Sequence, residues 1–223
     1  MKKYLLLACV AIAMLAVGCS KDDNKPSFRL QKNSVELFRE SEERIIVENA
    51  AGAISYRSQN PDIATVSSDG VVTGWVRGET NIEVHSGDES ALFHVMVGTR
   101  INTIPEPILE FGKSKDYIKS KIPKEAYKQS EREDMIAFML KSNGAEILYF
   151  YIFKEGLLKS CAFNVRMDVW EDLSLVDYLY ERYIYDGKTN DGDYLFFTPD
   201  RRIFVGTGTM VSSSVITVLY TPR

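Results

Sequence analysis

Short β-type segments separated by turn signals are the feature that most limits the fold of residues 28–98. Seven runs rich in Val, Ile, Thr and aromatic residues are divided by Gly, Asn, Asp or Pro. They lie at residues 35–38, 44–47, 53–58, 63–66, 71–76, 80–85 and 91–97. Ile82 and Val84 alternate with polar residues, as in a strand with one buried face. About seven short strands in a unit of this size predict a β-sandwich.

Three linked motifs in this unit resemble the bacterial Ig-like group 2 domain. They are Ser-Gln-Asn-Pro-Asp-Ile-Ala-Thr-Val at 58–66, Asp-Gly-Val-Val-Thr-Gly at 69–74 and Arg-Gly-Glu-Thr-Asn-Ile-Glu-Val at 77–84. The resemblance implies an Ig-like sandwich of the kind found in adhesins and other cell-surface proteins, where it serves as a spacer or binding module. An adhesin stalk repeats this domain, whereas the motifs occur once here, which argues against a stalk.

The N-terminal 18 residues have the anatomy of an export signal. Lys2 and Lys3 precede an apolar run at 4–16, which is too short to span a bilayer as a stable helix. The sequence Leu-Ala-Val-Gly-Cys at 15–19 resembles the lipobox of bacterial lipoproteins. That resemblance implies cleavage before Cys19 and acylation of its thiol, and acyl chains of this kind suffice for stable anchoring. The alternative is an ordinary secretory signal with an incidental cysteine.

The residues after Cys19 carry information on where in the cell envelope the protein is located. Ser-Lys-Asp-Asp at 20–23 resembles the short signal that sends some lipoproteins of Gram-negative bacteria to the outer face of the outer membrane. The resemblance implies a surface-exposed protein whose acylated Cys19 is held by outer-membrane lipid. The alternative is a plain solvated tether over 19–27 and a location at the periplasmic face. Loss of Lys2 and Lys3 with the signal takes the formal charge from −4 to −6, so anionic headgroups would repel the mature chain.

Composition and spacing give no support for catalysis, a metal or a cofactor. With 27 Lys and Arg against 31 Asp and Glu, the chain lacks the basic field that nucleic-acid binding needs. Cys161 lies in an apolar run and is expected to be a buried thiol. His85 and His94 have no carboxylate or cysteine partner at ligand spacing, and both lie far from the serines at 212–214. The loop at 186–193 fails the ligand pattern of an EF-hand. We therefore expect a protein that is not an enzyme.

Residues 103–223 form a second expected domain. The connector at 99–107, with Pro105 and Pro107, marks its boundary with the first unit. Capping and periodicity predict helices at 114–122 and 168–185, with a further helical turn at 124–129. Strands are expected at 135–141, 147–154, 157–165, 194–198, 202–209 and 215–220. This α-β-β-β-α-β-β-β order predicts an α+β domain with helices on one side of an antiparallel sheet, and it hints at a duplicated unit. Segments at 107–115, 179–183 and 218–222 are similar to a C-terminal domain of uncharacterised surface lipoproteins, which implies no activity.

The strand at 147–154 is apolar on both faces, and this allows two interpretations. Either it is a central strand covered on both sides, or one face forms an aromatic groove for a glycan or peptide. In the second case the helix at 168–185 would add two tyrosines. The candidate ligand-binding residues are then Tyr149, Tyr151, Phe153, Tyr178 and Tyr185.

Two functions fit these observations. One is a non-catalytic surface lipoprotein that binds a glycan or protein through its C-terminal domain, with the Ig-like domain as spacer or adhesion module. The other is a structural subunit of an envelope assembly. The surface geometry of the C-terminal domain discriminates between the two functions, because an exposed aromatic cleft favours a bound ligand, whereas a flat apolar patch favours assembly.

Overall fold

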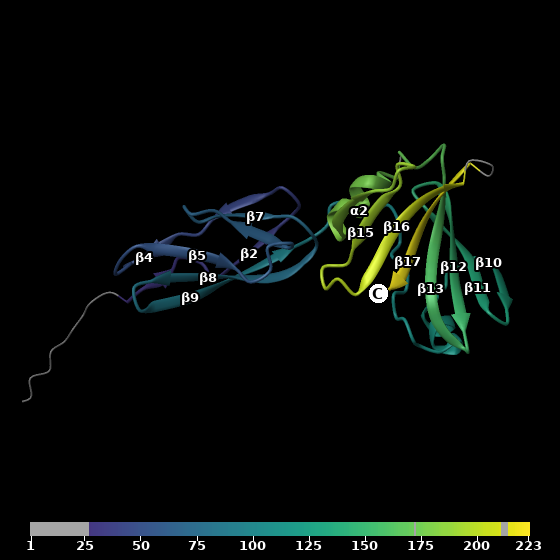
Figure 1. Ribbon diagram of the computed structural model, residues 1–223, viewed down its shortest axis with the longest axis horizontal. Coiled ribbons are helices and arrows are strands. Elements are labelled where there is room, and N and C mark those ends of the chain that lie inside the picture. The colour runs from purple at the N-terminus through teal and green to yellow at the C-terminus, as the bar shows by residue number, and fades with distance from the viewer. Residues whose placement is uncertain (1–26, 172, 211–213) are drawn as a thin grey trace, which may run out of the picture.

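The protein consists of two units that lie end to end, joined by a connector (Figure 1). The computed structural model describes residues 27–171, 173–210 and 214–223. The expected signal at 1–18, the acylated Cys19 and the tether up to residue 26 lie outside the described residues. No helix within the described ranges has the length and apolar character needed to cross a membrane.

The first unit is a sandwich of short strands. A four-stranded sheet has the order β2-β9-β8-β5, a three-stranded sheet has the order β3-β7-β6, and β1 pairs with β4. Buried residues from the two larger sheets form its core, among them Ile82 and Phe93 on one side and Val72 on the other. The strands are β1 Arg29–Leu30, β2 Ser34–Leu37, β3 Glu42–Arg44, β4 Val47–Glu48, β5 Ile54–Ser58, β6 Ala64–Val66, β7 Val71–Gly74, β8 Gly78–Ser86 and β9 Glu89–Val97.

Two turns of this unit follow directly from their residue types. The Asn60 side chain accepts a hydrogen bond from the Asp62 amide at 3.1 Å, which holds the Asn-Pro turn before β6. Gly70 has φ +81° and lies against the Tyr56 ring, so that a Cβ at this position would be 2.7 Å from Tyr56. Both the backbone conformation and the space therefore require glycine in the β6–β7 hairpin.

The second unit is dominated by one antiparallel sheet of eight strands. Its order is β10-β11-β12-β13-β17-β16-β15-β14, with β13 and β17 at the centre. Each half consists of one helix followed by four strands, so the order is mirrored about the central pair. The elements are α1 Lys115–Lys121, β10 Tyr127–Arg132, β11 Met135–Ser142, β12 Ala145–Lys154, β13 Leu157–Arg166, α2 Leu175–Arg182, β14 Ile184–Lys188, β15 Tyr194–Phe197, β16 Ile203–Met210 and β17 Val215–Pro222.

The expected α+β class is wrong for this unit, which is mostly β. The two helices in the described residues have seven and eight residues, too few to form a helical layer over an eight-stranded sheet. Residues 124–129, expected to be helical, lead into β10, and residues 184–188 form β14. The six strands predicted in this unit are confirmed, and β10 and β14 bring each half to four strands.

The second helix is much shorter than the span 168–185 predicted from its apolar stripe. Asp168 does not cap the helix, because its carboxylate binds the Arg166 guanidinium at 3.0 Å. The chain then turns through Ser174, which has a left-handed φ of 49°, and α2 starts at Leu175. At the other end Tyr183 is extended, with φ −131°, and the chain enters β14. Leu173 and Tyr183 within that span are buried, but Leu173 lies in the turn before α2 and Tyr183 directly follows the helix.

Two tight hairpins set the register of the first half of the sheet. Asn143 and Gly144 have φ 48° and 81° between β11 and β12, and Glu155 and Gly156 have φ 55° and 74° between β12 and β13. Positive φ at both central residues is the mark of a hairpin turn that matches strand twist. These turns join strands that the sequence predicts at 135–141, 147–154 and 157–165.

The core of the second unit contains a row of stacked aromatic rings. The Tyr149 ring lies 5.3 Å from that of Phe138 and 5.9 Å from that of Phe163, centroid to centroid. The Tyr149 hydroxyl donates a 2.6 Å hydrogen bond to the Pro105 carbonyl. Side chains of the connector and of both helices, including Ile104 and Ile118, complete this core. The connector therefore takes much of the place that a helical layer was expected to fill.

Charged residues at the end of α2 fasten the connector to both units. The Glu181 carboxylate accepts hydrogen bonds from the amides of Arg100 and Ile101 at 3.0 and 2.9 Å. Arg182, buried like Glu181, binds Glu106 at 3.1 Å. Glu106 also forms an ion pair with Arg77 of the first unit. The Arg77 amide in turn donates to the Glu181 carbonyl at 2.8 Å.

The aromatic row generates a stability prediction. We expect Tyr149→Ala to lower the free energy of unfolding by about 3–5 kcal/mol, because it removes a fully packed ring from the core. Tyr149→Phe keeps the ring and loses only the hydroxyl bond to Pro105, so its cost is about 1–2 kcal/mol. Urea denaturation of both variants measures these differences. Equal stability of the alanine variant and the native protein would contradict the assigned packing.

The junction generates a pH prediction. Burial by itself would raise the pKa of Glu106, but the hydrogen bond and charge of Arg77, with Arg182, outweigh it and hold that pKa below its usual value of 4.5. A carboxylate whose pKa is lowered on folding stabilises the protein at pH values above 4.5 and loses that contribution as the pH falls through its folded pKa. Because the Glu106 side chain is 35% exposed, we expect Glu106→Gln to cost only about 1 kcal/mol at neutral pH.

Chemical denaturation at neutral and acid pH measures this difference. The gap between native and Glu106→Gln protein should close as the pH is lowered well below 4.5, where both side chains are uncharged. A gap that is independent of pH would show that the ion pairs contribute nothing.

Candidate functional site

Four of the five candidate aromatic residues lie in the core of the second unit. The exposed fractions of Tyr149, Tyr151, Phe153 and Tyr178 are 1%, 0%, 4% and 0%. The Tyr151 hydroxyl accepts a hydrogen bond from the Ile108 amide at 2.9 Å, and this bond ties the connector to β12. Burial also raises the pKa of Tyr178. The expected aromatic groove on this face is therefore corrected to a packed core, because the connector and helices cover it.

The opposite face of the same strand carries the surface. Phe150 and Ile152 point away from the core, and Ile152 remains 39% exposed. An in-register row of small and apolar residues crosses six strands on this side of the sheet. From β11 to β15 it consists of Ala137, Phe150, Ala162, Leu219, Gly206 and Leu195. We call the sheet face that bears this row the open face.

The open face is apolar beyond its central row on β15 and β16, whereas Asn164 and Thr217 lie beside the row on the central strands. Phe204 pairs with Phe197 on the neighbouring strand, and their rings lie 5.7 Å apart. Leu219, near the sheet centre, is 40% exposed, so no described segment covers it. Soluble monomers rarely leave a continuous apolar surface of this kind without a partner.

Basic residues surround this apolar centre. Lys141 lies opposite Glu146 in the register, Arg166 lies opposite Val215, and the Arg223 guanidinium lies 5.1 Å from the Phe197 ring centroid. Arg132 and Lys154 stand at the other end of the strands, and all five are exposed. Glu146 on the same face is occupied: the Tyr127 hydroxyl donates to it at 2.6 Å, which raises the pKa of Tyr127 to about 12. Arg166 is paired with Asp168, so Arg132, Lys141, Lys154 and Arg223 give the rim of the open face its excess of positive charge.

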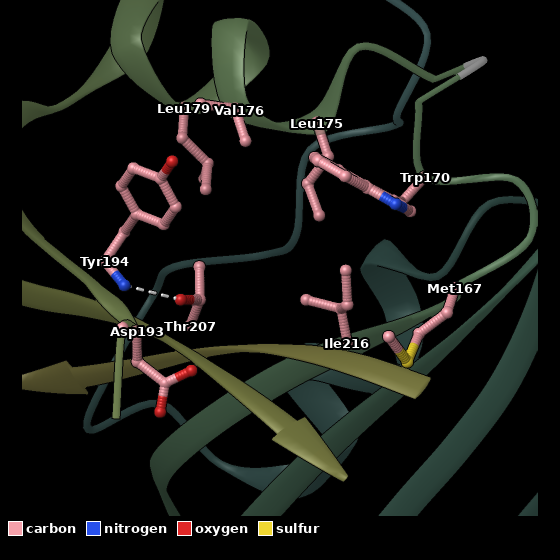
Figure 2. Close-up of a pocket in the computed structure, with 10 residues that line it drawn as sticks. Met167, Trp170, Leu175, Val176, Leu179, Asp193, Tyr194, Thr207 and Ile216 are labelled. Atoms are coloured by element: carbon pink, nitrogen blue, oxygen red, sulfur yellow. Dashed lines mark hydrogen bonds between the residues drawn. The ribbon is translucent and has the colours of Figure 1, made fainter. Parts of the chain in front are cut away.

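A small pocket lies on the other side of the sheet, under α2. Its volume is about 240 Å³. Figure 2 shows Leu175, Val176 and Leu179 pointing from the helix toward Thr207 and Ile216 on the strands. Thr207 accepts a hydrogen bond from the Tyr194 amide at 2.7 Å. The lining is mostly apolar, with Asp193 and Thr207 as its polar side chains, so the pocket fits an apolar group. It is lined by Met167, Trp170, Leu175, Val176, Leu179, Gly192, Asp193, Tyr194, Thr207 and Ile216.

Tyr185, the fifth candidate residue, belongs to an exposed aromatic edge. It is 44% exposed, and its ring lies 5.4 Å from that of Tyr180 and 6.3 Å from that of Tyr194. The Lys188 ammonium lies 4.0 Å from the Tyr194 ring centroid. This cluster joins α2 to the outer strands β14 and β15, beside the pocket.

The remaining candidates for chemistry lie apart from one another. Cys161 is completely buried, as predicted, and burial raises the pKa of its thiol. His94 contacts Asn81 at 3.3 Å, and the His85 ring lies 3.9 Å from Glu83. Across the described ranges, no three His, Cys, Asp or Glu side chains are grouped as metal ligands would be.

The sequence contains a signal for the open face, because the strand at 147–154 is apolar on both faces. Its alternation leaves open whether Tyr149 and Tyr151 are core residues or line an exposed groove. Phe150 and Ile152 are the surface residues. Alternation reveals which residues share a face, but it does not show which face the rest of the chain will cover.

Comparisons with known proteins agree with part of this structure. Residues 41–93, from just before β3 into β9, match the family model of the bacterial Ig-like domain (group 2). No curated protein matches the chain.

Two solved structures show distant similarity over 89% of this chain. One is the S-layer protein SbsC, domains 5–6, with 12% identity, a TM-score of 0.29 and 84% of that chain covered. The other is the surface layer protein SbsC, domains 4–9, with 15% identity, a TM-score of 0.30 and 27% of that chain covered. These TM-scores are too low to establish a common fold. The match to the family model confirms the Ig-like resemblance of the sequence for residues 41–93.

Proposed function

We propose that this protein is a lipid-anchored surface protein without catalytic activity that docks another protein on the open face of its second unit. The observation that carries this proposal is the row of small and apolar residues in register across six strands. Leu219 of that row is 40% exposed, and Ile152, two residues after Phe150 on β12, is 39% exposed. Acylated Cys19 would hold the protein in the outer membrane, and the Ig-like unit would act as the spacer.

The shape of the open face favours a protein partner over a sugar. Glycan sites use exposed aromatic rings and polar groups in a concave site. The Tyr149 and Tyr151 rings are buried, whereas the open face presents small, aliphatic and phenylalanine side chains on a sheet. An apolar centre with a charged rim is the usual anatomy of a protein interface. This arrangement supports a subunit of an envelope assembly.

Glycan binding is a second candidate, supported by Tyr185. Its ring is exposed and lies in a cluster with Tyr180 and Tyr194, which together could support the face of a sugar ring. The adjoining pocket and the Lys188 ammonium provide apolar and cationic neighbours.

Site-specific crosslinking in intact cells tests the docking proposal. A photoreactive side chain at Ile152 or Leu219 should give crosslinks to a protein, whereas the same group at Asp177 should not. Asp177 is exposed on α2 and lies outside the open face. If all three positions return only the uncrosslinked chain, the open face is not a docking surface.

Glycan arrays with the purified ectodomain test the second candidate. If Tyr185 supports a sugar, Tyr185→Ala should lower binding at least about tenfold, because it removes a stacking ring. Ile152→Ser, on the other side of the sheet, is the matched control and should leave glycan binding unchanged. Absence of binding to any glycan would leave no role for this cluster.

A further inference from the structure

We propose that the partner of the open face is a second copy of this chain, which contributes the outer face of its Ig-like sheet. By Ig-like outer face we mean the solvent side of the sheet β2-β9-β8-β5, with Glu36, Glu79, Glu83, Leu92 and Met96. The inference rests on the proposed docking function and names its occupant.

The Ig-like outer face has exposed apolar residues framed by acids. Leu92 and Met96 on β9 are 55% and 40% exposed. In the strand register Met96 lies between Glu36 on β2 and Glu79 on β8, and Leu92 lies beside Glu83. Core residues such as Phe93 and Val95 alternate with them, so these side chains all point to solvent. Glu83 forms an ion pair with Arg57 on β5 at 2.9 Å, and the His94 ring lies 3.7 Å from Glu79. The face therefore has an apolar centre, and its acidic frame rests on Glu36 and Glu79.

The two faces are complementary in charge. The open face has Arg132, Lys141, Lys154, Arg166 and Arg223 around its apolar centre. The first unit, residues 28–98, has six Lys and Arg residues against eleven Asp and Glu. Opposite charges around matching apolar centres favour encounter and fix the orientation of docking. Two open faces would instead repel each other, and so would two Ig-like outer faces.

The size of the contact predicts weak association. The strands β2, β9, β8 and β5 have four, nine, nine and five residues. At about 4.8 Å between strands and about 3.3 Å per residue they present roughly 400 Å². A stable specific interface buries about 800 Å² on each partner. The contact is therefore at the low end for a specific complex, and the charged rim should make it sensitive to salt. Because two different surfaces meet, the contact can continue from copy to copy unless a reciprocal pair closes it.

Sedimentation velocity and light scattering of the purified ectodomain measure the association. At millimolar protein and about 20 mM NaCl we expect species larger than the monomer, which dissociate at about 500 mM NaCl as the charges are screened. A closed dimer would indicate the reciprocal arrangement, and a continuing series of masses would indicate head-to-tail contact. A monomer under all conditions would overturn the inference.

Charge exchange makes the test specific to these two surfaces. Glu36→Lys with Glu79→Lys, and separately Arg132→Glu with Lys154→Glu, should each weaken self-association at least about tenfold, since like charges then face each other. Mixing the two variants should restore association into species that hold equal numbers of both, because the basic Ig-like face of one meets the acidic sheet face of the other, and their unaltered faces still match. Asp177→Lys is the matched control and should associate like the native protein. Circular dichroism melting checks that every variant is folded.

The outcomes separate this inference from the docking function. Crosslinks from Ile152 to another protein, together with a monomeric ectodomain, would retain the docking function and reject the second copy. Failure of the mixed variants to associate would also reject it, even if the single exchanges weaken the native association.

Discussion

The pairing of β13 with β17 is the interaction on which the second unit depends. Six residue pairs, from Cys161 with Tyr220 to Arg166 with Val215, join two helix-plus-four-strand halves into one sheet. Without this pairing each half would expose a long edge strand and half of a core. With it, the tilted rings of Phe163 and Tyr220 pack together at the centre of the core, 6.1 Å apart between ring centroids, and the apolar row of the open face becomes continuous across both halves.

The one-sided covering of this sheet links the fold to the proposed function. The connector is the covering element: Tyr149 and Tyr151 bond to it through Pro105 and Ile108, and Glu181 holds it at the end of α2. The same segment is bound to the Ig-like unit through Glu106 and Arg77. A chain that uses its connector in this way leaves the other side of the sheet free. Both the apolar centre and the basic rim of the open face stay exposed because the connector covers only the opposite side of the sheet.

Local features of the sequence predicted the strands and hairpins well. Asn143-Gly144 and Glu155-Gly156 adopt positive φ for reasons contained in a few residues, and the alternation of apolar side chains located the neighbouring strands. The helix at 168–185 was wrong because its periodicity runs through a turn, a short helix and the start of β14. The helix begins only after Ser174, because Asp168 pairs with Arg166 and Ser174 has a left-handed backbone conformation. The apolar periodicity reveals neither feature.

The sequence by itself determined the position of most strands, the Ig-like motifs and the two-sided apolar character of residues 147–154, since turn chemistry and alternation act between near neighbours. Only the tertiary structure decided that Tyr149 and Tyr151 are core and that Phe150 and Ile152 are surface. It also decided that β13 meets β17, and that Arg182 and Glu181 hold the connector. These features depend on contacts between residues tens of positions apart, and burial is a property of what the distant chain covers.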